Sequence, residues 1–168
     1  MKVLLEHEAE KLLAHYVPVA KGILTKNVEQ ARSGAKKLGY PIVLKLISPQ
    51  ALHKTEFNGV RIAINESELE KNYFDLLSTA KIKKFSLKGI LAQEFVEGRE
   101  LIIGLKKDAT FGHLVLVGFG GVLVEVMRDY SLRICPISLS DAQEMLDELK
   151  AKQLLYGFRG QKPLNTDL

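Results

Sequence analysis

Apolar residues in the first half of the chain recur at spacings of three and four positions, as on one face of an amphipathic helix. Three stretches show this pattern, at residues 5–16, 28–38 and 66–81. The stretches 41–47 and 59–64 are short apolar runs on either side of a polar loop, which favours strands. We therefore predict three helices and two strands here. The inward face of the first helix is predicted to be Leu5, Ala9, Leu12, Leu13 and Tyr16.

The second half changes to short apolar runs separated by glycine and aspartate turns. Such runs predict strands, and their close spacing favours an antiparallel meander over β-α-β crossovers. A helix is predicted from about Asp141, with Ser140 and Gln143 as a capping-box pair. The expected strands are residues 89–96, 100–105, 113–117, 122–126 and 132–136.

This order of elements predicts an α+β chain with two lobes around a cleft. A chain of 168 residues is long enough for two small lobes. We expect a helix-rich lobe at residues 1–88 and a strand-rich lobe at residues 89–168.

The composition is that of a globular protein, with 46% hydrophobic and 26% charged residues. The single cysteine, Cys135, excludes a disulfide framework. No apolar run approaches the length of about 18 residues that a membrane helix needs. The N-terminus also lacks a signal-peptide core. We therefore expect a cytoplasmic protein with no membrane partner.

The net charge of +4 is mild. Four lysines gather around one predicted turn at residues 81–88, and a solvated loop explains them well. A nucleic-acid site would combine more charge with arginine or aromatic residues. We therefore expect no nucleic-acid partner.

Lys45 lies inside the apolar run 41–47, where an unpaired charge would be costly. One interpretation is a strand lysine whose ammonium group reaches the surface. The other is a lysine that meets a polyanion, most often phosphate. The following loop favours the second interpretation, because Lys54 adds a charge and Asn58 and Gly59 allow backbone N–H groups to approach an anion.

His53 lies in this candidate phosphate loop. A neutral imidazole can attack phosphorus and hold a phosphoryl group, although its position alone does not assign this role. The other histidines, His7, His15 and His113, form no pair with metal-ligand spacing on one helix face.

Acidic residues in the second half suggest two further groups. Glu94 and Glu100 flank a turn, where they are either nucleotide contacts or ordinary exposed acids. Glu125 interrupts a run of valines and leucines after the turn 118–121, and Arg133 follows. Acids beside an arginine suit magnesium and phosphate oxygens. The turn itself matches neither a Walker A nor a Gly-x-Gly-x-x-Gly pattern.

Several blocks follow one another in a fixed order. They are residues 35–49, His53-Lys54, Gly59-Val60, 93–104, Asp108, Phe111-Gly112, 118–125, 129–133, Pro136 and 155–160. Together they resemble the ATP-grasp domain of ADP-forming acyl-CoA synthetases, in particular the β subunit of the acetate–CoA ligase type. The succinyl-CoA synthetase β subunit is more distantly similar. The resemblance covers nearly the whole chain.

The resemblance implies an ATP-grasp fold and a role for each matching residue. Lys45 would contact the ATP phosphates, with Lys54 beside it. Glu94 and Val96 would line the adenine pocket, and Glu100 would hold the ribose or phosphates. The remaining candidates are His53 as the phosphorylated histidine, Arg133 as a phosphate contact and Glu125 as a magnesium ligand.

The implied reaction converts acyl-CoA, ADP and phosphate reversibly into carboxylic acid, ATP and CoA. ATP or ADP and Mg²⁺ would be the cofactors. The chain shows no recognisable CoA-binding unit, so the resemblance implies a partner α subunit that carries that unit and a first catalytic histidine.

Two departures leave alternatives open. Asn58 replaces the first of two glycines, which is mild because asparagine tolerates left-handed backbone angles. The chain also ends at residues 165–168 without the Asn-Pro pair and later aspartate that hold magnesium in the family, so we expect a truncated C-terminal part. The alternatives are a non-catalytic ATP-binding or assembly module and an ATP-grasp ligase of another substrate class. The latter leaves the His53-Lys54 block unexplained.

Overall fold

The computed structural model describes residues 3–120, 128–157 and 163–164. These residues form two compact units, the first ending at Glu97 and the second beginning at Gly98. The predicted boundary, after residue 88, lies earlier in the chain. The difference arises because strand β4 (Gly89–Glu94) pairs with strands of the first unit. An apolar pattern predicts a strand, but it does not identify the strand's partner.

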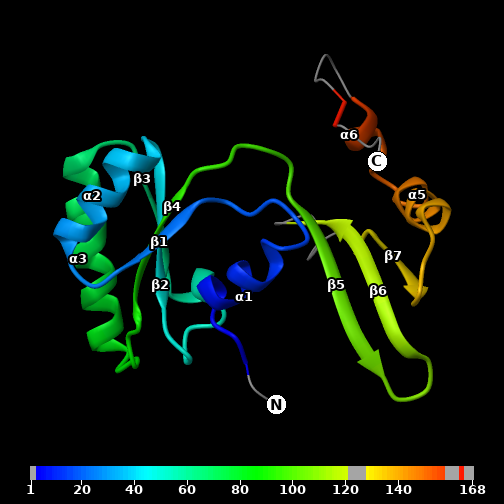
Figure 1. Ribbon diagram of the computed structural model, residues 1–168, viewed down its shortest axis with the longest axis horizontal. Coiled ribbons are helices and arrows are strands. Elements are labelled where there is room, and N and C mark those ends of the chain that lie inside the picture. Colours follow the sequence, from blue (N-terminus) through cyan, green and yellow to red (C-terminus); the bar gives the residue numbers. More distant parts are fainter. Residues whose placement is uncertain (1–2, 121–127, 158–162, 165–168) are drawn as a thin grey trace. The chain divides into compact units, whose positions relative to one another are not determined.

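The first unit is built on an antiparallel sheet of four strands in the order β1-β4-β2-β3. Helices α2 and α3 cover one face of this sheet (Figure 1). The bounds of the strands and helices are Gly22–Thr25 for β1, Ile42–Ile47 for β2, Val60–Ala63 for β3, Val28–Leu38 for α2 and Glu66–Ile82 for α3.

Every second residue of β2 points into the core of this unit. Ile42, Leu44 and Leu46 are fully buried in one cluster with residues of both helices. Each helix begins at an asparagine cap, because the side chains of Asn27 and Asn65 accept hydrogen bonds from backbone N–H groups of the first turns. The sequence predicted these two helices correctly.

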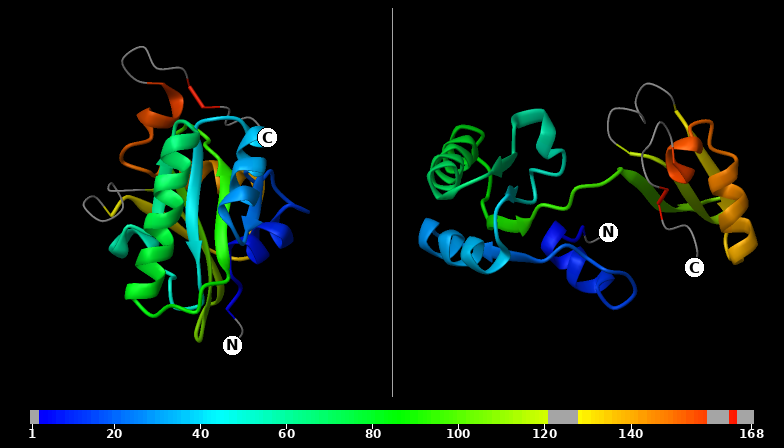
Figure 2. Two further views of the ribbon diagram at one scale, coloured as in Figure 1. Left: turned by 90° about the vertical axis from the view of Figure 1, so that its left-hand side faces the viewer. Right: turned by 90° about the horizontal axis from the view of Figure 1, so that it is seen from above.

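The other face of the sheet carries helix α1 (Glu6–Leu13) and the short 3₁₀ helix η1 (Lys54–Phe57) (Figures 1 and 2). No side chain of helix α1 is fully buried, and Tyr16 beyond its end is 80% exposed. The predicted inward apolar face was therefore wrong for Leu12, Leu13 and Tyr16, whereas Leu5 and Ala9 are half-buried. Two polar residues of α1, Glu6 and Glu10, lie one turn apart and accept hydrogen bonds from side chains of the sheet.

The second unit contains an antiparallel meander in the order β5-β6-β7. It confirms three of the predicted strands, while the predicted strand 122–126 lies outside the described residues. Helices α5 and α6 follow the meander, and Met145 of α5 is buried. The bounds are Leu101–Asp108 for β5, Gly112–Phe119 for β6, Tyr130–Ile134 for β7, Leu139–Asp147 for α5 and Gln153–Tyr156 for α6.

The cap of α5 differs from the predicted pair Ser140 and Gln143. Ser138 is the capping residue, and its hydroxyl accepts from the backbone N–H of Asp141 at 3.1 Å. The Asp141 carboxylate in turn accepts from the backbone N–H of Ser138 at 2.7 Å. The helix therefore begins about two residues earlier than expected, because an aspartate can complete a capping box as glutamate or glutamine does.

Within the part of the chain that the structure describes, no helix combines the length and apolar character needed to cross a membrane.

Replacing Leu44 by alanine is expected to lower the free energy of unfolding by about 2–5 kcal/mol, because it leaves a cavity between the sheet and its helices. Urea unfolding followed by circular dichroism would measure the loss. Ile62 on strand β3 is half exposed, so Ile62→Ala is the matched control and should cost much less. Equal losses at both positions would contradict the core position of Leu44.

Candidate functional site

Strand β2 presents Lys45 on the face opposite helices α2 and α3. Successive side chains of a strand point to opposite faces, so the buried Leu44 and Leu46 orient Lys45 away from the core. Lys45 lies opposite Val60 of β3 and Leu91 of β4 in the register of the sheet. Its side chain is 23% exposed, so its ammonium group is set within the protein surface.

The loop after β2 brings Lys54 to the same place. Asn58 adopts the left-handed conformation (φ 53°), and the N–H of Gly59 donates to the carbonyl of Lys54 at 2.7 Å, which closes the turn. Phe57 packs edge-on against Phe85, with ring centroids 5.1 Å apart. A Cβ at Gly59 would lie 2.4 Å from the Phe57 ring, so this close approach requires glycine.

One carboxylate joins the two lysines. Glu6 of α1 accepts from Lys45 Nζ through Oε1 at 2.6 Å and meets Lys54 Nζ through Oε2 at 2.8 Å. All three side chains are mostly buried, with exposures of 26% for Glu6, 23% for Lys45 and 16% for Lys54. We call these three residues the lysine–glutamate cluster. In this cluster two ammonium groups converge on the place that one anion, the Glu6 carboxylate, occupies.

The pKa of Glu6 reflects this position. Burial by itself would raise the pKa, but the hydrogen bonds and positive charges of Lys45 and Lys54 together outweigh it and lower the pKa below its usual value. Glu6 is therefore held as a carboxylate. The sequence did not single out Glu6: its spacing from Glu10 places both on one helix face, but this spacing does not identify Lys45 as the partner.

A second polar contact lies beside the cluster. The side-chain amide of Gln93 on β4 donates to Glu10 Oε1 at 2.8 Å. Gln93 is buried and lies opposite Val43 of β2. The two glutamates of α1 thus contact neighbouring strands of the same sheet.

His53 directly precedes η1 and is exposed. Its side chain lines an open pocket of about 370 Å³ together with Gln50, Glu56 and Lys83, among others. Lys45 and Lys54 do not line this pocket. The structure thus places His53 one residue before a member of the lysine–glutamate cluster, at a surface that a second molecule or segment can reach.

Glu94 and Val96 lie at and beyond the end of β4 in the first unit. The Glu94 carboxylate accepts from the backbone N–H of Lys21 at 2.8 Å, while the Glu94 N–H donates to the Lys21 carbonyl at 2.9 Å. Val96 is exposed. Their assignment to an adenine pocket remains a prediction.

Glu100 and Arg133 belong to the second unit. Glu100 is exposed, and its carbonyl accepts from the N–H of Gly120 at 2.6 Å. Glu125, the predicted magnesium ligand, lies outside the described residues. The described residues contain no group of three or more His, Cys, Asp or Glu side chains that could hold a metal ion.

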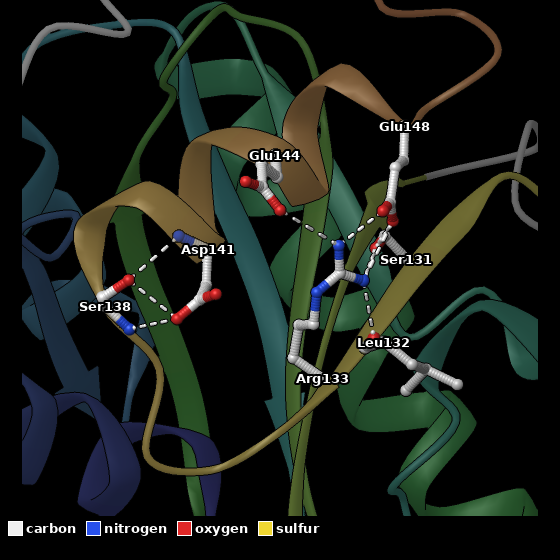
Figure 3. A network of polar contacts seen from close by, with 7 residues as sticks. All are labelled: Ser131, Leu132, Arg133, Ser138, Asp141, Glu144 and Glu148. Atoms are coloured by element: carbon white, nitrogen blue, oxygen red, sulfur yellow. Dashed lines mark hydrogen bonds and ion pairs between the residues drawn. The ribbon is translucent and has the colours of Figure 1, made fainter.

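Arg133 already has partners within its own unit (Figure 3). Its guanidinium group forms a two-pronged pair with the Glu148 carboxylate and also donates to the Ser131 hydroxyl at 3.2 Å. The hydrogen bonds from Arg133 and then Ser131 lower the pKa of Glu148 to about 2. In this arrangement Arg133 joins β7 to the end of α5, and its role as a phosphate contact remains a prediction.

Comparison with protein families matches residues 1–168 to the ATP-grasp domain. The chain belongs to the ATP-grasp family. This ATP-grasp chain therefore has the α+β fold that the sequence resemblance implied.

Several curated relatives are ADP-forming acetate–CoA ligases. The chain is 43% identical over 159 residues to acetate–CoA ligase I of Archaeoglobus fulgidus, covering 93% of this chain and 23% of that protein. It is 38% identical over 169 residues to the acetate–CoA ligase I β subunit of Pyrococcus furiosus, covering 98% of this chain and 73% of the subunit. The chain thus spans about a quarter of the single-chain relative.

A solved structure of an acetyl-coenzyme A synthetase 1 from Ca. Korarchaeum cryptofilum, in complex with coenzyme A and Ca-AMPCP, matches with a TM-score of 0.90. It is 44% identical and covers 95% of this ATP-grasp chain and 72% of its own. Another structure of the same synthetase contains Mg-AMPPCP and has a phosphohistidine segment pointing towards the nucleotide binding site.

The pair of Arg133 and Glu148 predicts a pH-dependent stability. The folded pKa of Glu148, about 2, lies below its usual 4.5, so its contribution is full above about pH 4.5 and is lost as the pH falls towards 2. Glu148→Gln should therefore lower the melting temperature at pH 7 and lower it progressively less between pH 4.5 and 2.

Glu144→Gln is the matched control, because the Glu144 carboxylate lies 3.9 Å from Arg133 Nη2 and its side chain is 66% exposed. Its effect on the melting temperature should be small at every pH. A Glu148→Gln effect of the same size at pH 7 and pH 2 would contradict the low pKa.

Proposed function

We propose that this chain is the nucleotide-binding part of an ADP-forming acyl-CoA synthetase of the acetate–CoA ligase type. The single observation that carries the proposal is the convergence of Lys45 and Lys54 on one anion position. Two mostly buried ammonium groups that share one carboxylate form a site suited to the phosphates of ATP or ADP. The ATP-grasp family and the nucleotide analogues bound to the Korarchaeum synthetase support it.

The remaining parts of the nucleotide would be bound by the other predicted residues. Glu94 and Val96 would line the adenine pocket, Glu100 would hold the ribose or phosphates and Arg133 would contact phosphate. To contact phosphate, the Arg133 guanidinium group would either bind Glu148 and the phosphate together or give up its pair with Glu148. Mg²⁺ would neutralise phosphate charge when bound, and Glu125 is the proposed ligand from this chain.

His53 is proposed as the phosphoryl carrier. A ring nitrogen of the neutral imidazole attacks the γ-phosphorus of ATP, the N–P bond forms, the bond from phosphorus to the bridging oxygen breaks, and ADP leaves. Loss of the proton from the other ring nitrogen leaves a neutral imidazole that carries the phosphoryl group. The exposure of His53 and the open pocket beside it allow it to reach both a nucleotide and a second site. The phosphohistidine segment of the Korarchaeum synthetase supports this role.

The complete reaction would convert acyl-CoA, ADP and phosphate into carboxylic acid, ATP and CoA, in either direction. Acyl-phosphate and CoA chemistry would take place on an α subunit or domain that carries the CoA-binding unit. The existence of separate β subunits in Pyrococcus furiosus supports a partner of this kind, and the cytoplasm is its proposed location.

Replacing Lys45 by alanine is expected to weaken ADP and ATP binding about ten- to a hundredfold, since a hydrogen bond to a charged group contributes roughly 1.5–3 kcal/mol. Calorimetry with magnesium present would measure the affinities. Lys37→Ala removes an exposed lysine on α2 and is the matched control, with an expected affinity close to that of the wild type. Equal affinities for wild type and Lys45→Ala would remove Lys45 from the site.

Replacing His53 by alanine is expected to abolish phosphorylation of this chain in the assembled complex. Incubation with ³²P-labelled ATP, or with acyl-CoA and labelled phosphate, should label the wild-type chain with an acid-labile, base-stable phosphoramidate. The variant should remain unlabelled and lose nearly all ligase turnover, because no neighbouring side chain can replace the nucleophile. It should still bind ADP, since the phosphate and adenine contacts are other residues.

His15→Ala is the matched control, because His15 is an exposed histidine with no assigned role. It should be labelled as the wild type is. A fully active His53→Ala complex would refute the carrier role. If the His53→Ala complex keeps reduced but measurable turnover, and the wild-type chain shows no label, His53 only contacts phosphate.

A further inference from the structure

Helix α1 occupies the proposed phosphate site through Glu6. The carboxylate of Glu6 lies between Lys45 and Lys54, at 2.6 and 2.8 Å from their ammonium groups. Without Glu6 the two positive charges would face each other in a mostly buried position with no counter-charge, which is costly. Glu6 therefore stabilises the lysines when no nucleotide is bound.

The attachment of α1 to the sheet depends on few contacts. No side chain of the helix is fully buried, and its leucines Leu12 and Leu13 are about half exposed. An open pocket of about 500 Å³ separates part of α1 from strand β1, with His7 and Lys11 among its lining residues. Polar contacts of Glu6 and Glu10 therefore make a large part of the attachment, and helix propensity alone would not hold eight residues in place.

A nucleotide phosphate bound at Lys45 and Lys54 would compete with the Glu6 carboxylate for their ammonium groups. Phosphate groups carry more negative charge than one carboxylate and would lie next to Glu6 if it stayed. Two like charges a few ångströms apart in a partly buried site repel each other strongly. The carboxylate and the phosphates therefore disfavour each other at the same pair of ammonium groups.

We propose that Glu6 is an internal competitor of the nucleotide, and that phosphate binding at Lys45 and Lys54 releases α1 from the sheet. This inference rests on the proposed nucleotide function. It adds a coupling between the occupancy of the phosphate site and the position of the N-terminal helix. Because such coupling is reciprocal, weakening the attachment at Glu6 must strengthen phosphate binding.

The first test removes the competing charge. Glu6→Gln is expected to bind ADP and tripolyphosphate more tightly than the wild type, by roughly 5- to 150-fold, the usual span of coupling between two ligands. Calorimetry on the complete chain measures both affinities, and tripolyphosphate isolates the phosphate contribution from the adenine contacts. Glu29→Gln makes the same change of net charge at an exposed position on α2 and should leave both affinities unchanged.

The second test uses the wild-type chain, so it does not depend on the folding of a variant. Hydrogen exchange at short labelling times should show faster exchange of the α1 amides, residues 6–13, when ADP is bound. In Glu6→Gln these amides should already exchange fast without ADP. A purely structural Glu6 predicts the opposite, with α1 exchange unchanged or slowed by ADP.

The outcomes separate the inference from the proposed function. If Lys45→Ala weakens ADP binding, while Glu6→Gln binds no more tightly and α1 exchange does not rise, the competitor role is overturned and the nucleotide site stands. If the wild type and Lys45→Ala bind ADP equally, or neither binds it, both are overturned. Tighter binding by Glu6→Gln together with faster α1 exchange on ADP binding supports the proposal.

Discussion

An ammonium group in an inner strand of a sheet needs an anion beside it, and this constraint organises the first unit. Strand β2 must keep Ile42, Leu44 and Leu46 towards the helices, so Lys45 necessarily points to the other face. There it is too buried to be satisfied by water alone. The chain meets this need with a polar N-terminal helix in place of an apolar one, and the loop that carries Lys54 shares the same anion.

Local pattern was enough to predict most helices and strands, because the periodicity of α2, α3 and the meander is strong. The predictions that failed concern contacts between residues far apart in the sequence. Strand β4 was assigned to the wrong half because its partners, β1 and β2, lie far away in the sequence. Lys45 could be singled out from its apolar neighbours, but Glu6 could not, since nothing local shows which of several glutamates meets it.

Helix α1 shows why an amphipathic pattern can mislead. Its leucines follow helical spacing, and the pattern alone favours burial of that face. In the structure the glutamates on another face are preferred, because the surface opposite them offers an ammonium group and the side-chain amide of Gln93. Lys45 and Gln93 share this sheet face with the apolar residues Val43, Val60 and Leu91, so two polar partners are enough to orient the helix.

Lys45 and Arg133 are both predicted phosphate contacts, and their partners in the structure distinguish them. Arg133 is paired in two-pronged geometry with Glu148, which is next to the fully buried Leu149 and is also bonded to Ser131. Glu6 belongs to a helix that has no fully buried side chain. Replacing Glu148 by phosphate as the partner of Arg133 would disturb the packed end of α5. Replacing Glu6 by phosphate as the partner of Lys45 would move only α1, which is weakly attached. Of the two cations, Lys45 is therefore the one whose present anion can be replaced by a ligand at low cost to the fold.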